Sequence, residues 1–302
     1  MKRESFRRTL RGEGNIDLRV HPSKKHEGEI MNIAKSTVVT MAPTTPIYDA
    51  VQTMAKQGFR RIPLTNAGTE ALEGIVTATD IIDYLGGGEK FEIIRRRFGG
   101  NIFKAINEPI RIIMNKQVVS VSSTAKISDA IELMTSTNLG GLPVIDEHDH
   151  LRAIITERDI AILFADMLSG VKVAELMSEK VVTALAKTTI FEAEQSMATR
   201  GFRRLPIISD GKLAGIITTM DVIRFFGSGE VFKHLQSGTI IQVLNTPALN
   251  IASKEVFTIG PDADVGEAAK IMRDKDIGAV PVVKEEKLVG IITERDFFKI
   301  IK

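Results

Sequence analysis

The sequence predicts an α/β (α+β) fold built from four tandem copies of one β-α-β-β-α unit. Three observations carry this prediction. An apolar run ending in Thr-x-x-Asp occurs four times, an amphipathic helical stripe precedes each copy, and a proline-containing strand lies between the two. An internal period of this kind is typical of repeat architectures, so we consider the repeated unit before its separate elements.

Length and composition indicate a globular protein with about two domains. The chain has 302 residues, 43% hydrophobic and 26% charged, and no apolar run approaches the roughly 18 residues of a membrane span. The first residues are basic rather than apolar, so we expect no secretory signal, no membrane partner and a cytoplasmic location. The absence of cysteine excludes disulfide frameworks, thiolate nucleophiles and cysteine metal sites.

Each unit begins with a short β-prone segment and continues into an amphipathic helix. β-Branched residues favour strands at Thr37–Thr40, Gln117–Ser120, Lys180–Thr183 and Glu255–Thr258. The helices are predicted from stripes at i, i+3, i+4 and i+7. These stripes are Ile47, Ala50, Val51 and Met54; Ile127, Ala130, Ile131 and Met134; Ile190, Ala193, Glu194 and Met197; and Val265, Ala268, Ala269 and Met272. We interpret the methionine that ends each stripe as core filler.

Two strands then form a predicted hairpin, and a second helix starts at Thr-x-x-Asp. The hairpin segments are 61–64 with 72–77, 141–145 with 151–156, 205–208 with 213–218, and 280–283 with 288–293. Glycine and polar residues between them suit tight turns. A proline in each first hairpin strand predicts that this strand lies at a sheet edge or faces a cleft, because proline lacks the N–H that a central strand donates.

Units one and three differ from units two and four. The first pair shares Gly-Phe-Arg-Arg at 58–61 and 201–204, and the second pair shares Thr-Glu-Arg-Asp at 156–159 and 293–296. The distance along the chain from unit one to unit three nearly equals that from unit two to unit four. We therefore infer that a segment of two units was duplicated as a whole. The predicted divisions are a basic, flexible tail over 1–29 and units over 30–100, 101–168, 171–238 and 239–302.

Units that end in Gly/Ala-Ile-Ile/Val-Thr-x-x-Asp resemble CBS (cystathionine β-synthase) domains, which associate in pairs called Bateman modules. From residue 30 onward the layout resembles archaeal four-CBS proteins related to the gamma subunit of AMP-activated protein kinase. The resemblance implies a flat disc of two modules, with adenine nucleotides in clefts between paired domains. It also implies that each Asp binds ribose, that each Thr lies beside the ribose and phosphate, and that the arginines before Pro63 and Pro206 contact phosphate. The residues carried over are Thr77, Asp80, Thr156, Asp159, Thr218, Asp221, Thr293 and Asp296, with Arg60, Arg61, Arg203 and Arg204.

Thr-x-x-Asp also has a purely structural explanation, because Thr and an acidic residue at this spacing form a capping box at a helix start. A cap accepts Ser, Asn, Glu or Gln as well, yet all four copies hold Thr and Asp. A carboxylate can accept two hydrogen bonds from a ribose diol, and the amides at a helix N-terminus favour phosphate. The two roles are compatible, and both are retained.

The arginines are the second part of the predicted site. Guanidinium groups suit bidentate phosphate contact, so the repeated pairs favour a phosphorylated ligand over solvent-facing arginines at an edge. Alternation along a strand sends the members of each pair to opposite faces, one to its own cleft and one to its sister's. Arg158 and Arg295 directly precede their Asp, where they either supply the cation that units two and four lack or form a surface salt bridge with Glu157 or Glu294.

Enzyme activity is not expected. His148-Asp-His150 falls in a hairpin turn without a further ligand cluster, and Gly86–Lys90 lacks the Gly-Lys-Ser/Thr frame of a P-loop. No nucleophile stands beside a positioned base. The basic cluster Arg95–Arg97 is predicted on an exposed helix face that ends at Gly99.

The sequence therefore predicts a non-catalytic regulator, without a metal or catalytic cofactor, that binds AMP, ADP or ATP and signals to an unidentified regulated protein. S-adenosylmethionine is the alternative ligand, since it offers a ribose diol but no phosphate. The net charge is only +2, so nucleic acid is not expected as a partner of the whole molecule; a nucleic-acid arm in the basic tail is a third hypothesis. The number of occupied clefts, the preferred nucleotide and the oligomeric state, a homodimer included, stay open.

Overall fold

The first helix of every repeat forms as predicted. The computed structural model describes residues 28–233 and 240–301. Within them the first helices are α2 (Ile47–Gln57), α6 (Ile127–Ser136), α9 (Ile190–Arg200) and α13 (Val265–Asp274). The methionine that ends each stripe is at most 1% exposed, which confirms it as core filler. α2 and α9 end at Gly58 and Gly201, whose positive φ angles suit a residue without a side chain.

The four predicted hairpins are also present. β1 (Arg61–Thr65) pairs with β2 (Leu72–Thr77), β4 (Gly141–Ile145) with β5 (Leu151–Thr156), β7 (Arg204–Ser209) with β8 (Lys212–Thr218), and β9 (Ala279–Lys284) with β10 (Lys287–Thr293). Each ladder has one register shift near its turn. The residue two places before the proline is always opposite the threonine of Thr-x-x-Asp, as in Arg61 opposite Thr77. The hairpin register therefore places the first-strand residue at the junction where the next helix starts.

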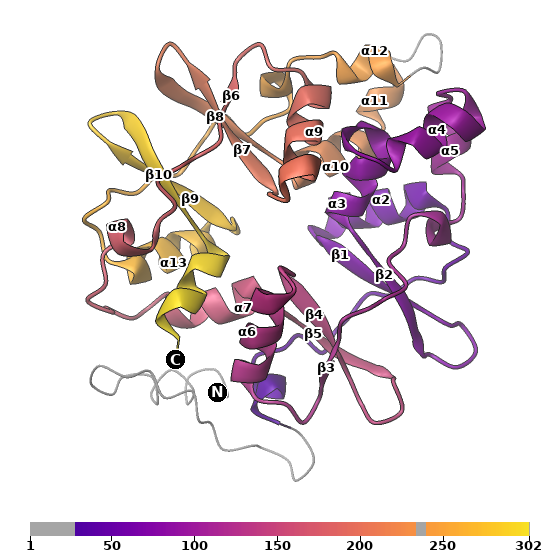
Figure 1. Cartoon of the computed structure of the whole chain (residues 1–302), viewed down its shortest axis with the longest axis horizontal. Coiled ribbons are helices and arrows are strands. Elements are labelled where there is room, and N and C mark those ends of the chain that lie inside the picture. The colour runs from indigo at the N-terminus through magenta and orange to yellow at the C-terminus, as the bar shows by residue number, and fades with distance from the viewer. Residues whose placement is uncertain (1–27, 234–239, 302) are drawn as a thin grey trace. The chain divides into compact units, whose positions relative to one another are not determined.

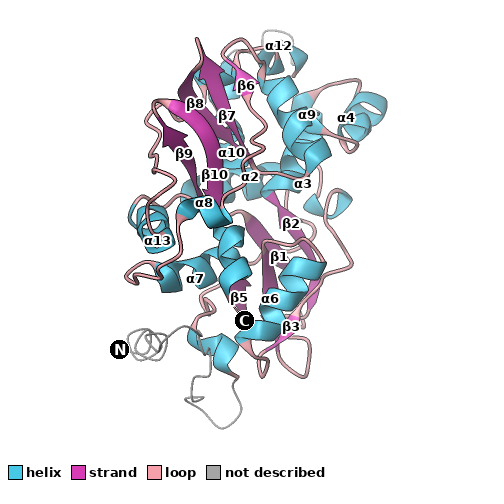
Figure 2. Cartoon of the chain, turned by 60° about the vertical axis from the view of Figure 1, so that its left-hand side comes forward, coloured by secondary structure: helices cyan, strands magenta, loops and turns pink. Residues whose placement is uncertain are grey.

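The expected edge position of the prolines is wrong for repeats two and three. Short strands β3 (Val121–Ser122) and β6 (Ala184–Leu185) pair in parallel with β4 and β7, which makes these two the central strands of their sheets. Figure 2 shows how short these strands are beside the hairpins. The parallel strands pair only with residues after the proline, as in Val121 with Val144 after Pro143, so the ladder needs no proline N–H.

The second helix of each repeat starts directly after the threonine and varies in length. These elements are α3 (Ala78–Ile82) with the π-turn η2 (Asp83–Gly87), α7 (Glu157–Ala161) with the 3₁₀ turn η4 (Ile162–Phe164), α10 (Thr219–Gly227), and the 3₁₀ helix η6 (Glu294–Ile300). The remaining helices are α4 (Phe91–Phe98), α5 (Ile102–Ile106), α8 (Val173–Leu176), α11 (Glu230–Lys233) and α12 (Ile241–Leu244), with 3₁₀ turns η1 (Glu29–Asn32), η3 (Ile110–Ile112) and η5 (Ala248–Asn250). Arg95–Arg97 lie exposed on α4, which ends at Gly99 as predicted.

The chain folds into two compact units that interleave along the sequence. One, here called the even unit, contains the chain up to Val38, Val119–Val181 and Phe257–Lys302, and so holds repeats two and four. The other, the odd unit, contains Val39–Val118 and Val182–Val256, and so holds repeats one and three. Helix packing explains this grouping. In the odd unit α2 packs on α10 (Figure 1) and α9 on η2, while in the even unit α7 packs on η6 and α13 on η4.

The four β-prone tetrapeptides are connectors between the units rather than strands. Each unit boundary falls between the two central residues of such a tetrapeptide, for example between Val38 and Val39. The segment before each boundary pairs with its neighbouring repeat: Lys35 bridges Ile154 of repeat two, and Asn115 bridges Ile75 of repeat one. β-Branched residues favour any extended backbone, so sequence propensity alone did not distinguish a connector from a strand.

Candidate functional site

Each Thr-x-x-Asp forms a capping box at the start of its helix. The Asp Oδ2 accepts hydrogen bonds from the backbone N–H and from the hydroxyl of the threonine three residues earlier. The Thr Oγ1 to Asp Oδ2 distances are 2.6 Å at Asp80 and Asp159, 2.7 Å at Asp221 and 2.8 Å at Asp296. The capping role considered from the sequence is therefore present in all four repeats. The threonine hydroxyl thus donates to its own aspartate and orients the carboxylate.

The second oxygen of each aspartate faces a cation. Lys90 Nζ lies 2.5 Å from Asp80 Oδ1, Lys299 Nζ lies 2.7 Å from Asp296 Oδ1, and an Arg224 terminal nitrogen lies 3.1 Å from Asp221 Oδ1. At Asp159 the corresponding distance, to Lys35 Nζ, is 3.9 Å. These cations were not predicted. The sequence contained one signal for them, since Arg224 and Lys299 both follow their aspartate by three residues, one helical turn.

The aspartate side chains lie where solvent reaches them poorly. Asp221 is 7% exposed, and burial raises its pKa despite the hydrogen bonds from Thr218 and the charge of Arg224, which lower it. Burial disfavours the charged carboxylate because the site cannot replace all of its hydration. A ligand that donates hydrogen bonds to Oδ1 would restore part of that lost solvation.

The hairpin geometry brings the arginine pairs to these junctions. In the odd unit Arg61 lies opposite Thr77 and Arg204 lies opposite Thr218. The carbonyl of Arg60 accepts the Ala78 N–H at 2.9 Å, and the carbonyl of Arg203 accepts the Thr219 N–H at 3.0 Å. Both members of each pair are thus fixed by the backbone beside the helix start. The even unit has Gly140, Gly141, Gly278 and Ala279 at the four matching positions.

Arg158 and Arg295 form crossed ion pairs inside the even unit. Arg158 Nε donates to Glu294 Oε1 at 2.9 Å, and Arg295 Nε donates to Glu157 Oε1 at 2.5 Å. Arg158 also contacts Asp276, and Arg295 contacts Asn138. The two glutamates are only 1% and 2% exposed, while the arginines are 17% and 33% exposed, so these are partly buried bridges between repeats rather than surface salt bridges. Of the two interpretations of the sequence, the salt bridge is present, and the partners come from the opposite repeat.

The helices that follow the junctions are shorter than the phosphate argument assumed. α3 and α7 have five residues each and η6 is a 3₁₀ helix, whereas α10 has nine residues. The macrodipole sums over aligned peptide units, so a single turn contributes little of it. A phosphate at these junctions would therefore be attracted mainly by side-chain cations.

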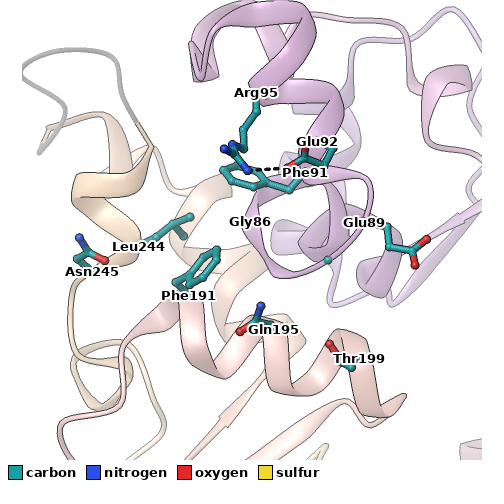
Figure 3. Close-up of a pocket in the computed structure, with 11 residues that line it drawn as sticks. Gly86, Glu89, Phe91, Glu92, Arg95, Phe191, Gln195, Thr199, Leu244 and Asn245 are labelled. Carbon is teal, nitrogen blue, oxygen red and sulfur yellow. Dashed lines mark hydrogen bonds and ion pairs between the residues drawn. The ribbon is translucent and has the colours of Figure 1, made fainter.

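The odd unit also contains a pocket of about 610 Å³ between η2, α4, α9 and α12 (Figure 3). Phe91 and Phe191 form its apolar part, with ring centroids 6.4 Å apart, while Gln195 and Asn245 supply amides. Gly86 lines the pocket too, and a Cβ there would lie 3.3 Å from Glu194 Oε2. Glu194 itself is completely buried, and neither oxygen has a hydrogen-bond partner within the described residues.

The histidines and the basic tail considered from the sequence contribute no side chain to these junctions in the described part of the chain. The amides of His148 and His150 donate to Asp146 Oδ1, which places both histidines in the predicted hairpin turn. Within residues 28–233 and 240–301, no group of three or more His, Cys, Asp and Glu side chains could hold a metal. The basic tail, for which a nucleic-acid arm was considered, lies outside the described residues apart from its last two positions.

Four hairpin-and-helix repeats with one capped aspartate each define a repeat protein of the CBS class. A family model for the CBS domain matches residues 28–87, 110–166, 173–228 and 248–302, and the chain belongs to this family. These matches include the segment that precedes each connector.

Relatives with the same layout support this assignment. The chain is 38% identical to MJ1225 of Methanocaldococcus jannaschii over 89% of its own length and 98% of that protein. The crystal structure of MJ1225, a proposed archaeal homologue of g-AMPK, superposes with a TM-score of 0.85. A 33.4 kDa protein of Thermofilum pendens is 33% identical over 83% of each chain. A Pyrococcus horikoshii structure with 21% identity and a TM-score of 0.56 shares the fold.

None of the helices in the described part of the chain is long and apolar enough to cross a membrane.

Proposed function

We propose that this protein is a non-catalytic cytoplasmic sensor that binds AMP, ADP or ATP at its Thr-x-x-Asp junctions. The bound nucleotide biases the packing of the repeats, and a regulated protein partner reads the change. Such a device needs only different affinities for two packing states. No catalytic cofactor takes part.

One observation carries the proposal: at every junction the capping box uses one aspartate oxygen and leaves the other turned toward a cation. A cap alone needs only the first oxygen. The second oxygen can accept a hydrogen bond from a ribose hydroxyl once the neighbouring cation turns away from it. The similarity to MJ1225, described as a proposed homologue of g-AMPK, favours adenine nucleotides as the ligand class.

The arginine pairs favour nucleotides over S-adenosylmethionine. Arg60, Arg61, Arg203 and Arg204 are held at the two junctions of the odd unit, and guanidinium groups pair with phosphate in a bidentate geometry. S-adenosylmethionine has no phosphate, and its single carboxylate lies beside an ammonium group that the same arginines repel. We therefore assign phosphate contact to the odd unit. In the even unit Arg158 and Arg295 are proposed to reach a ligand only by leaving their crossed ion pairs.

Titration calorimetry with AMP, ADP and ATP tests the proposal. We expect saturable binding of at least one of them, with S-adenosylmethionine competing weakly. Absence of binding by all three nucleotides contradicts the proposal. Tighter binding of S-adenosylmethionine than of any nucleotide would make S-adenosylmethionine the ligand instead. Steep salt dependence of nucleic-acid binding that disappears on deleting residues 1–26 would favour the tail hypothesis instead.

A further inference from the structure

Lys90 occupies the aspartate oxygen that a ribose would use in repeat one. Its Nζ lies 2.5 Å from Asp80 Oδ1 and also donates to the Ile113 carbonyl at 3.1 Å. The side chain of Lys90 is 30% exposed and that of Asp80 is 20% exposed, so this contact is partly shielded from water. A ligand hydroxyl that approaches Oδ1 must share this oxygen with an ammonium group that has two acceptors, or displace it.

The turn before Lys90 is built to hold it there. Asp83 Oδ1 accepts the backbone N–H of Lys90 at 3.3 Å, and Asp83 Oδ2 lies 3.9 Å from Lys90 Nζ. A Cβ at Gly88 would lie only 1.9 Å from Asp83 Oδ1, so a larger residue would push this carboxylate away. The Gly86–Lys90 segment, which resembles no phosphate loop, therefore has a local role in positioning the lysine.

Repeat three of the same unit lacks this arrangement. Aligning Gly88-Glu-Lys-Phe91 with Gly229-Glu-Val-Phe232 puts the fully buried Val231 at the position of Lys90. Arg224 takes the position of Asp83 and contacts Asp221 Oδ1 at 3.1 Å. Its side chain is 56% exposed and comes from the same helix, so it can turn into solvent without breaking a hydrogen bond to a backbone carbonyl.

We propose that Lys90 is a latch that closes the Asp80 site against nucleotide, so that repeat one binds more weakly than repeat three. This inference rests on the proposed function, because it concerns the nucleotide site assigned there. A site that must first lose an internal contact has an apparent affinity reduced by the fraction of molecules in the open state. The two odd junctions then respond at different nucleotide concentrations.

Lys90→Val, which installs the residue of repeat three, is the direct test. By calorimetry with AMP we expect this variant to gain about fivefold in affinity at one site, the size of a partly exposed ion pair. Adding Asp80→Asn to Lys90→Val should abolish the gain. Gly88→Ala, which displaces Asp83 but keeps the lysine, should give a smaller gain. Lys104→Val removes the same charge from an exposed position on α5 and should change nothing.

Unchanged or weaker AMP binding by Lys90→Val overturns the latch, and weaker binding would make Lys90 a phosphate ligand. Those outcomes leave the proposed function standing, because the wild type still binds. Absence of AMP, ADP and ATP binding by both the wild type and Lys90→Val overturns both proposals.

Discussion

The odd and even units share one fold and one capping box per repeat, but they place their positive charge differently. The odd unit carries two arginines at the start of each first hairpin strand and small or uncharged residues, Ala78-Thr79 and Thr219-Met220, after the threonine. The even unit carries glycine or alanine on the strand and Glu-Arg after the threonine. In the even unit each arginine binds the buried glutamate of the opposite repeat.

This difference suggests a division of labour between the units. A partly buried, reciprocal ion pair fixes the packing of two repeats, whereas arginines held beside a capped aspartate are placed for an anionic ligand. Under the proposed function, the ion pairs of the even unit hold its two repeats together, and the odd unit is the main phosphate-binding part.

Removing one partner of an ion pair in the even unit should have the largest effect. Arg158→Thr introduces the residue found at the matching position of repeat one, Thr79, and leaves the buried Glu294 without this partner. We expect it to lower the free energy of unfolding, measured in urea, by about 3 kcal/mol. The double variant Arg158→Thr with Glu294→Ala should lose less than the single variant, because no charge stays buried. Thr79→Ala at the matching odd position should change stability by less than about 0.5 kcal/mol. Equal losses at both positions would remove the distinction between the units.

Glu194 is an acidic residue in the buried stripe of repeat three, in the odd unit. The matching stripe positions of the other three repeats hold Val51, Ile131 and Ala269. Burial raises the pKa of Glu194 well above its ordinary value, because desolvation penalises the carboxylate. Between the unfolded pKa, about 4.3, and the higher folded value, only the folded state keeps the proton, so stability falls with rising pH by up to about 1.4 kcal/mol per unit.

Glu194→Gln removes this titration, so the stability of the variant relative to the wild type should rise as the pH increases above the ordinary glutamate range. Urea unfolding at several pH values measures the difference. Glu267→Gln, on the exposed face of α13, should show no such divergence. Parallel stability curves for Glu194→Gln and the wild type would mean that the carboxyl finds a partner or water.

The arginine pairs of the odd unit should affect ligand affinity. Arg204→Gln should weaken AMP binding about tenfold and leave adenosine binding unchanged, because adenosine has no phosphate. Arg200→Gln, at the exposed end of α9, is the matched control for charge. An equal loss for AMP and adenosine would assign Arg204 a structural role.

Local patterns made much of this fold predictable. The helices, hairpins and capping boxes follow from spacings of a few residues, such as the stripe from Ile47 to Met54 and the box from Thr293 to Asp296. The connectors were misinterpreted as strands, because Val38-Val39 favours extended backbone in either setting.

Long-range pairing was not accessible from one sequence. Lys90 meets Asp80 through a turn that reverses the chain, and Arg158 meets Glu294 from another repeat. Neither contact has a periodic signature, so Lys90 and the crossed partners became visible only in the structure. Arg224 and Lys299, by contrast, follow their aspartates by three residues, which is one helical turn.

The number of nucleotides retained by the chain, counted by native mass spectrometry, tests most directly whether the capped aspartates bind ligand. Asp221→Asn keeps an acceptor oxygen for the Thr218 cap, so its stability should fall by at most about 1 kcal/mol. The variant should retain one nucleotide fewer than the wild type in the presence of AMP. An unchanged count, with only a stability loss, would mean that Asp221 caps α10 and does nothing more.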